Sequence, residues 1–378
     1  MTDRSGINEN CLSKFSLRTR WRHLFVLERA VGAHYNVVGS YTGPTHLLAL
    51  CSVPLPRRYY SKIKQARHGF IPFCAFRRKE WTINMINVLH LGLSYKCNMN
   101  CNHCYVIRKE DRLQENDYYS IIDTLYENGL FFLYYTFGEP LCSPLFNTIS
   151  SYAKKKGIVQ VLMTNGSLIA FDTINMLRDN SITKVCISID HIDSNKHDNN
   201  RKYKGSFNKA IESLRMLVAN NIKSEISMTV NDTNAMCLYE VYNLAQSLSV
   251  NFISFLRQRN SGCIEWMKNE ELYLSFFEDI ILKKQNDVNV LFHDPSLLSL
   301  LNKMKNSKKI DKSTYERYRE MNRCHYNRTI SIEPNGDVKR CNLRNIVIGN
   351  TLHTSLSQIV EKEINKNDDI IHCSSISK

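Results

Sequence analysis

Three cysteines lie close together in the chain and have the spacing of ligands to one metal centre. Cys97, Cys101 and Cys104 are separated by three and then by two residues, within the segment LGLSYKCNMNCNHCYV. Soft thiolate ligands select iron–sulfur clusters, zinc or copper(I). A four-iron cluster takes four ligands, normally four cysteines. Because this segment supplies three, one iron would stay open to a substrate or cofactor, which predicts a reactive cluster rather than an electron carrier.

This CxxxCxxC spacing, with Tyr105 directly after the last cysteine, resembles that of the radical S-adenosylmethionine (SAM) superfamily. In that family the open iron chelates SAM through its amino and carboxylate groups. The resemblance implies a [4Fe-4S] cluster and SAM as cofactors, with Tyr105 among the residues beside SAM. A zinc knuckle is the alternative, with His103 as a fourth ligand, although structural zinc sites usually pair two short couples of ligands.

Composition and charge describe an ordinary globular protein. The chain has 378 residues, 43% hydrophobic content and a net charge of +14. It has no apolar run of about 18 residues, so no membrane span is expected. Its 13 cysteines, an odd number with one tight cluster, favour a reducing compartment and hence a cytoplasmic location. The basic charge could attract an acidic peptide or nucleic acid, but no aromatic–basic alternation indicates a nucleic-acid module, so no nucleic-acid partner is expected.

Strand-like and helix-like segments alternate regularly from about residue 86. The predicted strands cover residues 87–94, 130–138, 159–166, 183–190, 223–230 and 251–258. The predicted helices cover residues 115–128, 143–157, 171–180, 205–220, 235–248 and 269–285. This alternation implies βαβ units around a parallel sheet. Six units predict an α/β fold, a partial (β/α)6 TIM-like barrel, with its chemistry at the carboxyl ends of the strands.

The segment after the second predicted strand resembles a SAM-binding segment of the family. It reads Thr136-Phe137-Gly138-Glu139-Pro140, where the family has Gly-Gly-Glu-Pro, whose backbone and Glu hold the SAM amino group. Gly138, Glu139 and Pro140 are therefore expected to bind SAM. Phe137 replaces the first glycine, at a position that would call for a positive φ. A plain loop before a helix would explain the proline and the glycine, but not the glutamate.

Further SAM contacts are expected after the third and fourth strands. Asn165 lies in an Asn-Gly turn, which is a weak signal by itself. Ser188 and Asp190 point to one face of their strand and match a family position that hydrogen-bonds the ribose diol or the amino-acid part of SAM. Arg201, before Lys-Gly-Ser-Phe, is a candidate for the SAM carboxylate, because a guanidinium matches a carboxylate bidentately. A strand-end turn and a surface arginine are the structural alternatives.

The C-terminal part carries a hairpin signal between cysteines. Two alternating runs, RTISIEP and DVKRC, flank Asn335-Gly336, a strong β-hairpin signature. Cys324 precedes the hairpin, Cys341 lies at its far end, and Cys373 is the only further cysteine of the tail. With the IGN segment and an amphipathic helix, this resembles the SPASM or twitch extension of radical SAM enzymes. A full extension binds two auxiliary clusters with seven cysteines. Three cysteines imply at most one auxiliary cluster here, and its loss is the alternative.

Three regions and a radical chemistry are therefore expected. Residues 1–82 form an N-terminal cap or leader-binding-like segment, residues 83–285 the radical SAM core, and residues 286–378 the linker and extension. The resemblance, over about residues 86–350, implies reductive SAM cleavage to a 5′-deoxyadenosyl radical that abstracts a substrate hydrogen atom. An electron donor such as flavodoxin or ferredoxin is implied.

The basic charge and the extension favour an enzyme that matures a ribosomally made peptide by crosslinking, epimerisation or oxidation. Two alternatives stay open. One is a small-molecule dehydrogenase or epimerase of sugar or antibiotic biosynthesis, which the short, cysteine-poor tail favours. The other is a non-catalytic metal-binding interaction module.

Overall fold

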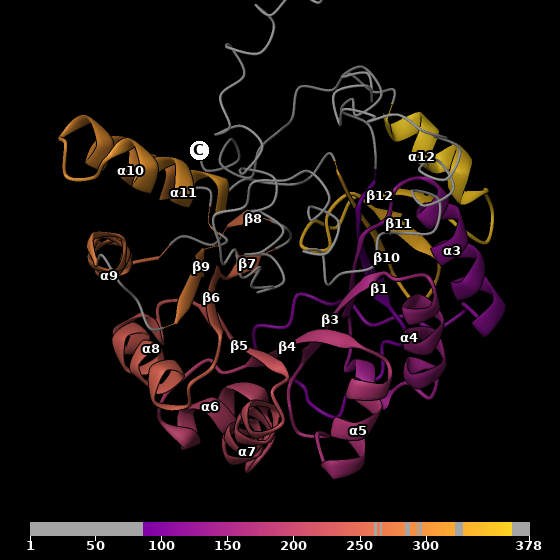
Figure 1. Ribbon diagram of the computed structural model, residues 1–378, viewed down its shortest axis with the longest axis horizontal. Coiled ribbons are helices and arrows are strands. Elements are labelled where there is room, and N and C mark those ends of the chain that lie inside the picture. Colours follow the sequence, from indigo (N-terminus) through magenta and orange to yellow (C-terminus); the bar gives the residue numbers. More distant parts are fainter. Residues whose placement is uncertain are drawn as a thin grey trace, which may run out of the picture. The chain divides into compact units, whose positions relative to one another are not determined.

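The structure is a computed structural model that describes residues 86–260, 263–264, 267–283, 288–292, 294, 297–321 and 328–364. The predicted N-terminal segment, Cys324 and Cys373 lie outside these residues, so the expectations about them, including the auxiliary cluster, stay predictions. Figure 1 shows the described part as a curved sheet with helices along its outer side.

A single large sheet forms the framework of the described residues. Its strand order is β12-β11-β10-β1-β2-β3-β4-β5-β6-β9. The six expected strands are β1 (Val88–Gly92), β2 (Phe132–Thr136), β3 (Val159–Thr164), β4 (Ile182–Ser188), β5 (Lys223–Val230) and β6 (Phe252–Arg257). Each pairs in parallel with the next. The α/β fold with a partial parallel barrel is therefore confirmed.

The expected helices lie between these strands. They are α3 (Glu115–Glu127), α4 (Phe146–Lys155), α5 (Phe171–Asp179), α7 (Ser206–Ala219), α8 (Leu238–Ser247) and α9 (Glu270–Leu282). The start predicted for α4 was wrong by three residues. Ser143 and Pro144 form a turn instead, in which the Ser143 carbonyl accepts the Phe146 N–H at 3.2 Å.

Helix α6 (Ser194–Arg201) and strand β9 (Asn289–Phe292) are among the elements of the barrel region that had no sequence signal. Helix α6 is almost entirely polar and begins where the Asp193 side chain accepts the Asn195 and Lys196 N–H groups. Such a cap satisfies donors that a helix start leaves unpaired. Strand β9 pairs in parallel with β6 and extends the sheet. Helices α10 (Leu297–Asn306) and α11 (Lys312–Met321) follow it.

The two faces of the barrel strands differ in burial. Leu89, Leu91, Leu133 and Tyr135 are fully buried in the hydrophobic core. Burying a leucine side chain stabilises the fold by about 1.5–3 kcal/mol. The alternate residues share the other face and are less buried on β1 and β2, where the His90 and Tyr134 rings of that face stack 4.9 Å apart. Alternate residues of β1 and β2 therefore pack in the hydrophobic core or face the barrel interior.

The interior face also carries a buried ion pair. Lys184 Nζ on β4 lies 2.5 Å from Glu225 Oε2 on β5, and each residue is 3% exposed. The strand register places Lys184 beside Val161, and Val161 beside Tyr134, so these residues share one face of the sheet. Attraction between the two charges must therefore offset the cost of removing both from water.

The C-terminal hairpin extends the barrel sheet. Strand β10 (Thr329–Ile332) pairs in parallel with β1, and β11 (Asp337–Lys339) returns antiparallel to β10, which confirms the hairpin. The turn has three residues, 334–336, instead of the expected two, and Gly336 ends it with φ +88°. Strand β12 (Val347–Asn350) and helix α12 (Leu356–Ile364) follow.

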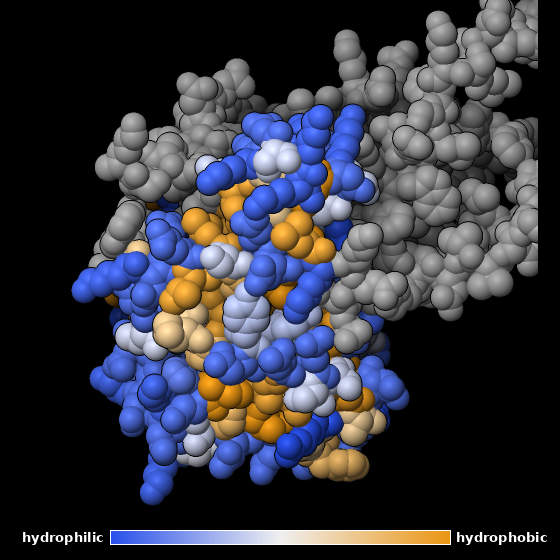
Figure 2. Space-filling model, turned by 90° about the vertical axis from the view of Figure 1, so that its left-hand side faces the viewer, coloured by the Kyte–Doolittle hydropathy of each residue, from blue (hydrophilic) through white to orange (hydrophobic). Residues whose placement is uncertain are grey.

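No helix in the described part of the chain is both long and apolar enough to cross a membrane. Figure 2 faces the side of the molecule on which α8 and α9 lie, where apolar side chains form patches between polar ones. Exposed apolar residues of these two helices are Tyr239, Leu272 and Leu282. Apolar groups make up a large part of the surface of any folded protein, so such exposure does not by itself mark a binding site.

Candidate functional site

The three cysteines lie on the loop that leaves the carboxyl end of β1, here called the cluster loop (residues 93–113). Cys97 and Cys101 are partly buried, and Cys104 is exposed. Two backbone hydrogen bonds fix the loop, from Glu139 N to Lys96 O and from Asn102 N to Asn200 O, both at 2.8 Å. The structure therefore places all three thiols at the end of the sheet where a parallel barrel has its chemistry.

The surroundings of the thiols fit an iron–sulfur cluster. Among the described residues, no three His, Cys, Asp or Glu side chains are grouped so that they could hold one metal ion. A [4Fe-4S] cluster needs a different arrangement, because each thiolate binds its own iron. Met99 N donates to Cys97 Sγ at 3.4 Å, and Arg201 Nη1 donates to Cys101 Sγ at 3.7 Å. Donors of this kind stabilise cluster sulfurs and tune their potential.

Burial raises the pKa of the Cys97 thiol to about 11. A metal centre binds the thiolate and therefore has to displace this proton. The donor set of three thiols with N–H groups directed at two of them suits such a centre.

The turn after β2 approaches the cluster loop closely. Phe137 and Gly138 both have positive φ values, +63° and +50°. A Cβ on Gly138 would lie 2.4 Å from Lys96 O and 2.5 Å from Ser94 O. The left-handed conformation costs a residue with a side chain about 1–2 kcal/mol. The Phe137 ring is 4% exposed and packs near Gly92, so its burial offsets this cost.

We expect Gly138→Ala to destabilise the protein by about 1–3 kcal/mol or more, because its Cβ meets backbone oxygens at a strained φ. The variant should also retain less iron after reconstitution, since the turn supports the cluster loop. Thermal denaturation and iron content check both. Gly205→Ala is the matched control: Gly205 also has a positive φ, +83°, but a Cβ there meets nothing within 4 Å. Equal losses in both variants would contradict the role of close approach.

Glu139 links the ends of β2 and β3. It is 1% exposed and accepts hydrogen bonds from Thr164 Oγ1 at 2.7 Å, Asn165 N at 2.8 Å and Leu141 N at 3.2 Å. Burial raises the pKa of this carboxyl group, although the three donors act against the shift. Pro140 is buried and begins the short 3-10 helix η3 (Pro140–Cys142). The expected contact of Glu139 with SAM stays a prediction.

Asn165 connects β3 to the cluster loop. Its Nδ2 donates to Asn98 Oδ1 at 2.9 Å, and Asn98 Nδ2 donates to Ser167 Oγ at 2.7 Å. Asn98 directly follows Cys97. The expected site residue therefore lies beside the cysteines, although its contact with SAM stays untested.

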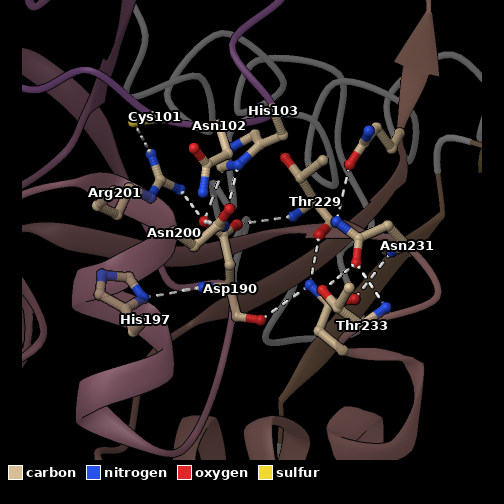
Figure 3. A network of polar contacts seen from close by, with 12 residues as sticks. Cys101, Asn102, His103, Asp190, His197, Asn200, Arg201, Thr229, Asn231 and Thr233 are labelled. Carbon is tan, nitrogen blue, oxygen red and sulfur yellow. Dashed lines mark hydrogen bonds and ion pairs between the residues drawn. The ribbon is translucent and has the colours of Figure 1, made fainter.

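Asp190 is the centre of the polar network in Figure 3. It is 1% exposed, and its carboxylate is approached by Arg201 Nη2 at 2.7 Å, Asn200 Nδ2 at 3.2 Å, Thr229 N at 3.2 Å and His103 Nε2 at 3.6 Å. Burial alone would raise the pKa of Asp190, but the Arg201 charge holds it below its ordinary value. Asp190 and Arg201, which the sequence analysis assigned to SAM separately, thus form an ion pair with each other.

Arg201 joins this network to the cluster loop. It is 7% exposed, and its other terminal nitrogen is the donor to Cys101 Sγ. Ser188, one pleat before Asp190, is partly exposed. His103 and Asn200 were missed as members of the network, because their contact depends on α6, a helix without a periodic pattern.

A cavity of about 580 Å³ lies beside this network. Its lining residues come from the cluster loop, from α6 and from the segments that follow β4, β5 and β6; they include His103, Asp190, Asn231, Gln258 and Met267. Asn231 Nδ2 donates to Gln258 Oε1 at 2.7 Å. The lining is thus mainly polar, with amide, imidazole and carboxylate groups.

Two expected residues lie towards the C-terminal part. Tyr105 is 40% exposed, and its hydroxyl accepts a hydrogen bond from Asn342 Nδ2 at 3.4 Å. Asn342 follows Cys341, which is partly buried. Tyr105 does not line the cavity. Its contact with SAM stays a prediction, as does cluster binding by Cys341.

Comparisons with known proteins identify a matching family, related sequences and a shared fold. The family model described as "Radical SAM superfamily" matches residues 92–244, from the end of β1 into α8. The "Antilisterial bacteriocin subtilosin biosynthesis protein AlbA" of Bacillus subtilis is 26% identical over 281 residues, which are 71% of this chain and 58% of that protein. The Fe-coproporphyrin III synthase of Methanosarcina barkeri is 28% identical over 187 residues, 48% of this chain and 47% of that protein. The chain thus spans about half the length of these relatives.

A solved structure shows the same fold. Streptococcus suis SuiB bound to precursor peptide SuiA matches with a TM-score of 0.59 and 16% identity, over 95% of this chain and 79% of that chain. The matched family uses a [4Fe-4S] cluster and SAM, and three cysteines of this chain lie at the carboxyl end of β1, where the sequence predicts that cluster. By its cysteine loop, its partial barrel and its relatives, the chain carries a radical SAM domain, which the family model matches at residues 92–244.

Proposed function

We propose that this protein is a radical SAM enzyme that matures a ribosomally made peptide. The observation that carries the proposal is the cavity of about 580 Å³ next to the cluster loop, with Asp190 and His103 in its wall. Two likenesses support a peptide substrate. AlbA is named for the biosynthesis of a bacteriocin, and SuiB was solved with a precursor peptide. The net charge of +14 favours acidic segments in such a peptide.

The residues of the chain would hold and orient the reactants. When bound, the reduced cluster and SAM supply a 5′-deoxyadenosyl radical that can take a hydrogen atom from an unactivated C–H bond. Cys97, Cys101 and Cys104 would hold the cluster. Arg201, fixed by Asp190, keeps a positive charge beside Cys101 Sγ.

The amide groups of the cavity wall would bind the substrate. Asn231 and Gln258 together offer donors and acceptors that suit a peptide backbone. Their mutual hydrogen bond of 2.7 Å holds both side chains in place before the substrate arrives. A polar wall of this kind orients the target C–H bond, while the cofactors do the bond breaking.

Anaerobic reconstitution tests the proposal. The chain is loaded with iron and sulfide, both are counted, and 5′-deoxyadenosine is measured with SAM, a reductant and a peptide encoded beside the gene. We expect the peptide to be modified, with loss of two hydrogens for a crosslink or oxidation, or with solvent deuterium uptake for an epimerisation. A full cluster without any SAM cleavage would contradict the proposal.

A small-molecule substrate is the second candidate. It is favoured by the likeness to an Fe-coproporphyrin III synthase and by the cavity volume, which lies within the usual range of about 300–1,000 Å³ for small ligands. Comparing SAM cleavage with the peptide and with small candidates separates the two. Hydrogen abstraction from a small molecule, but not from the peptide, would favour the small-molecule hypothesis.

A further inference from the structure

We propose that the C-terminal hairpin positions the cluster loop, and that Glu333 and Tyr95 are the residues through which it does so. The inference rests on the cluster assigned above to Cys97, Cys101 and Cys104. It gives the extension a part in the SAM-cluster site itself, independent of any cluster that the extension could bind.

The start of the cluster loop is tied to the end of β10. Tyr95 lies two residues before Cys97, is 3% exposed and donates its hydroxyl proton to the Glu333 carboxylate. The same hydroxyl lies 3.0 Å from Asn335 Oδ1 in the hairpin turn. A tyrosine hydroxyl has one proton to donate, and the charged carboxylate is the stronger acceptor, so the bond to Glu333 is the one that fixes its position.

The end of the cluster loop is tied to the same hairpin. Pro334 O accepts two backbone hydrogen bonds, from Arg112 N and Leu113 N, both at 2.9 Å. Lys109 Nζ lies 2.7 Å from Asp337 Oδ2, at the start of β11. The hairpin therefore holds both ends of the loop. Fixing the ends of a loop in advance lowers the entropy that its ordering costs.

Glu333 is a rigid anchor for these contacts. It is 4% exposed and accepts a hydrogen bond from Lys339, while Lys109 Nζ lies 3.7 Å from its other oxygen. Lys339 Nζ is fixed in turn by Asn345 Oδ1 at 2.9 Å. Charge-assisted hydrogen bonds in a buried place are short and strong. The carboxylate that receives Tyr95 thus has little freedom to move.

Tyr95 acts on the backbone two residues before Cys97 rather than on the thiol itself. Loss of residues that orient metal ligands typically lowers metal affinity about 10–100-fold, which sets the scale of the effect. The path is short: Tyr95 precedes Lys96, whose carbonyl is held by Glu139, and Cys97 follows. A shift of Tyr95 would be passed directly to the first cluster ligand.

The test compares two tyrosine–carboxylate pairs. Tyr95→Phe removes only the hydroxyl. Tyr273→Phe is the matched control, because the buried Tyr273 donates to Asp294 Oδ2 at 2.8 Å outside the cluster loop. After reconstitution, we expect Tyr95→Phe to lose its cluster to a chelator about tenfold faster than the wild type. We also expect its reduced cluster to give an altered electron paramagnetic resonance spectrum, with a weaker change on SAM addition. Tyr273→Phe should match the wild type in both.

A second pair of variants separates positioning from folding. Glu333→Gln keeps an oxygen acceptor for Tyr95, whereas Glu333→Ala removes it, so the glutamine variant should retain its cluster longer than the alanine variant. The inference is overturned if Tyr95→Phe keeps the wild-type chelation rate and spectrum, or if Tyr273→Phe changes them equally. A wild-type chain with a stable cluster that cleaves no SAM would contradict the proposed function. The chelation rates and resonance spectra of the variants would still decide whether the hairpin positions the cluster loop.

Discussion

Cys97→Ala is expected to lose the [4Fe-4S] cluster and to lower 5′-deoxyadenosine formation to the level of a protein-free control. The cluster loop offers three thiols, so the variant leaves two, too few to hold four irons in place. Iron content should fall by about four per chain after desalting. Absorbance of the reconstituted protein, iron and sulfide counts and the SAM-cleavage assay measure the effect.

The control for this variant is another thiol of the same chain. Cys237 is 5% exposed, and its Sγ donates to Asn234 O at 3.1 Å, away from the cluster loop. Cys237→Ala should keep full iron content and SAM cleavage, apart from a modest loss of stability. If Cys97→Ala cleaved SAM at the wild-type rate, the assignment of the cluster to this loop would be wrong.

Loss of either partner of the Lys184–Glu225 pair is expected to lower the free energy of unfolding by about 3–5 kcal/mol. Both side chains are buried in the barrel interior, so Glu225→Gln would leave the Lys184 charge without its counter-ion. Burial alone would lower the pKa of Lys184, but the Glu225 charge raises it above its ordinary value. Chemical denaturation, followed by circular dichroism, measures the change.

Two controls separate burial from charge pairing. The double variant Lys184→Met with Glu225→Leu should be more stable than either single variant, because no unpaired charge remains in the interior. Lys309 Nζ and Glu278 Oε1 are also 2.5 Å apart, but lie at the surface. Glu278→Gln should therefore cost at most about 1 kcal/mol. A similar cost for Glu278→Gln and Glu225→Gln would show that burial does not set the strength of the pair.

The sequence predicted what depends on local pattern. Alternating strands, amphipathic helices and the Asn335-Gly336 turn are each encoded within a few residues, and all appear in the structure. The positive φ of Phe137 also followed from its place in a glycine position. Helix α6 was not predicted, because its residues are polar and its start depends on the Asp193 side chain.

The site was predicted in part for a similar reason. Asp190 and Arg201 were recognised at strand ends and in a motif, but their ion pair at 2.7 Å arises only once α6 has formed. Tyr95 follows β1 and Glu333 follows β10, so their contact joins residues that are far apart in the sequence. Such a contact cannot be predicted from periodicity or spacing, because each of the two residues looks like an ordinary residue at the end of a strand.

The place of β10 next to β1 has a consequence for biosynthesis. Strand β1 and the cysteines leave the ribosome early, whereas β10 emerges after the whole run of βα units. Until then β1 presents an unpaired edge, the kind that invites pairing with other chains. The cluster loop also lacks its hairpin partner during that time. By the inference above, a cluster loaded before β10 pairs with β1 would lack the support of the hairpin and should be held less firmly than one loaded afterwards.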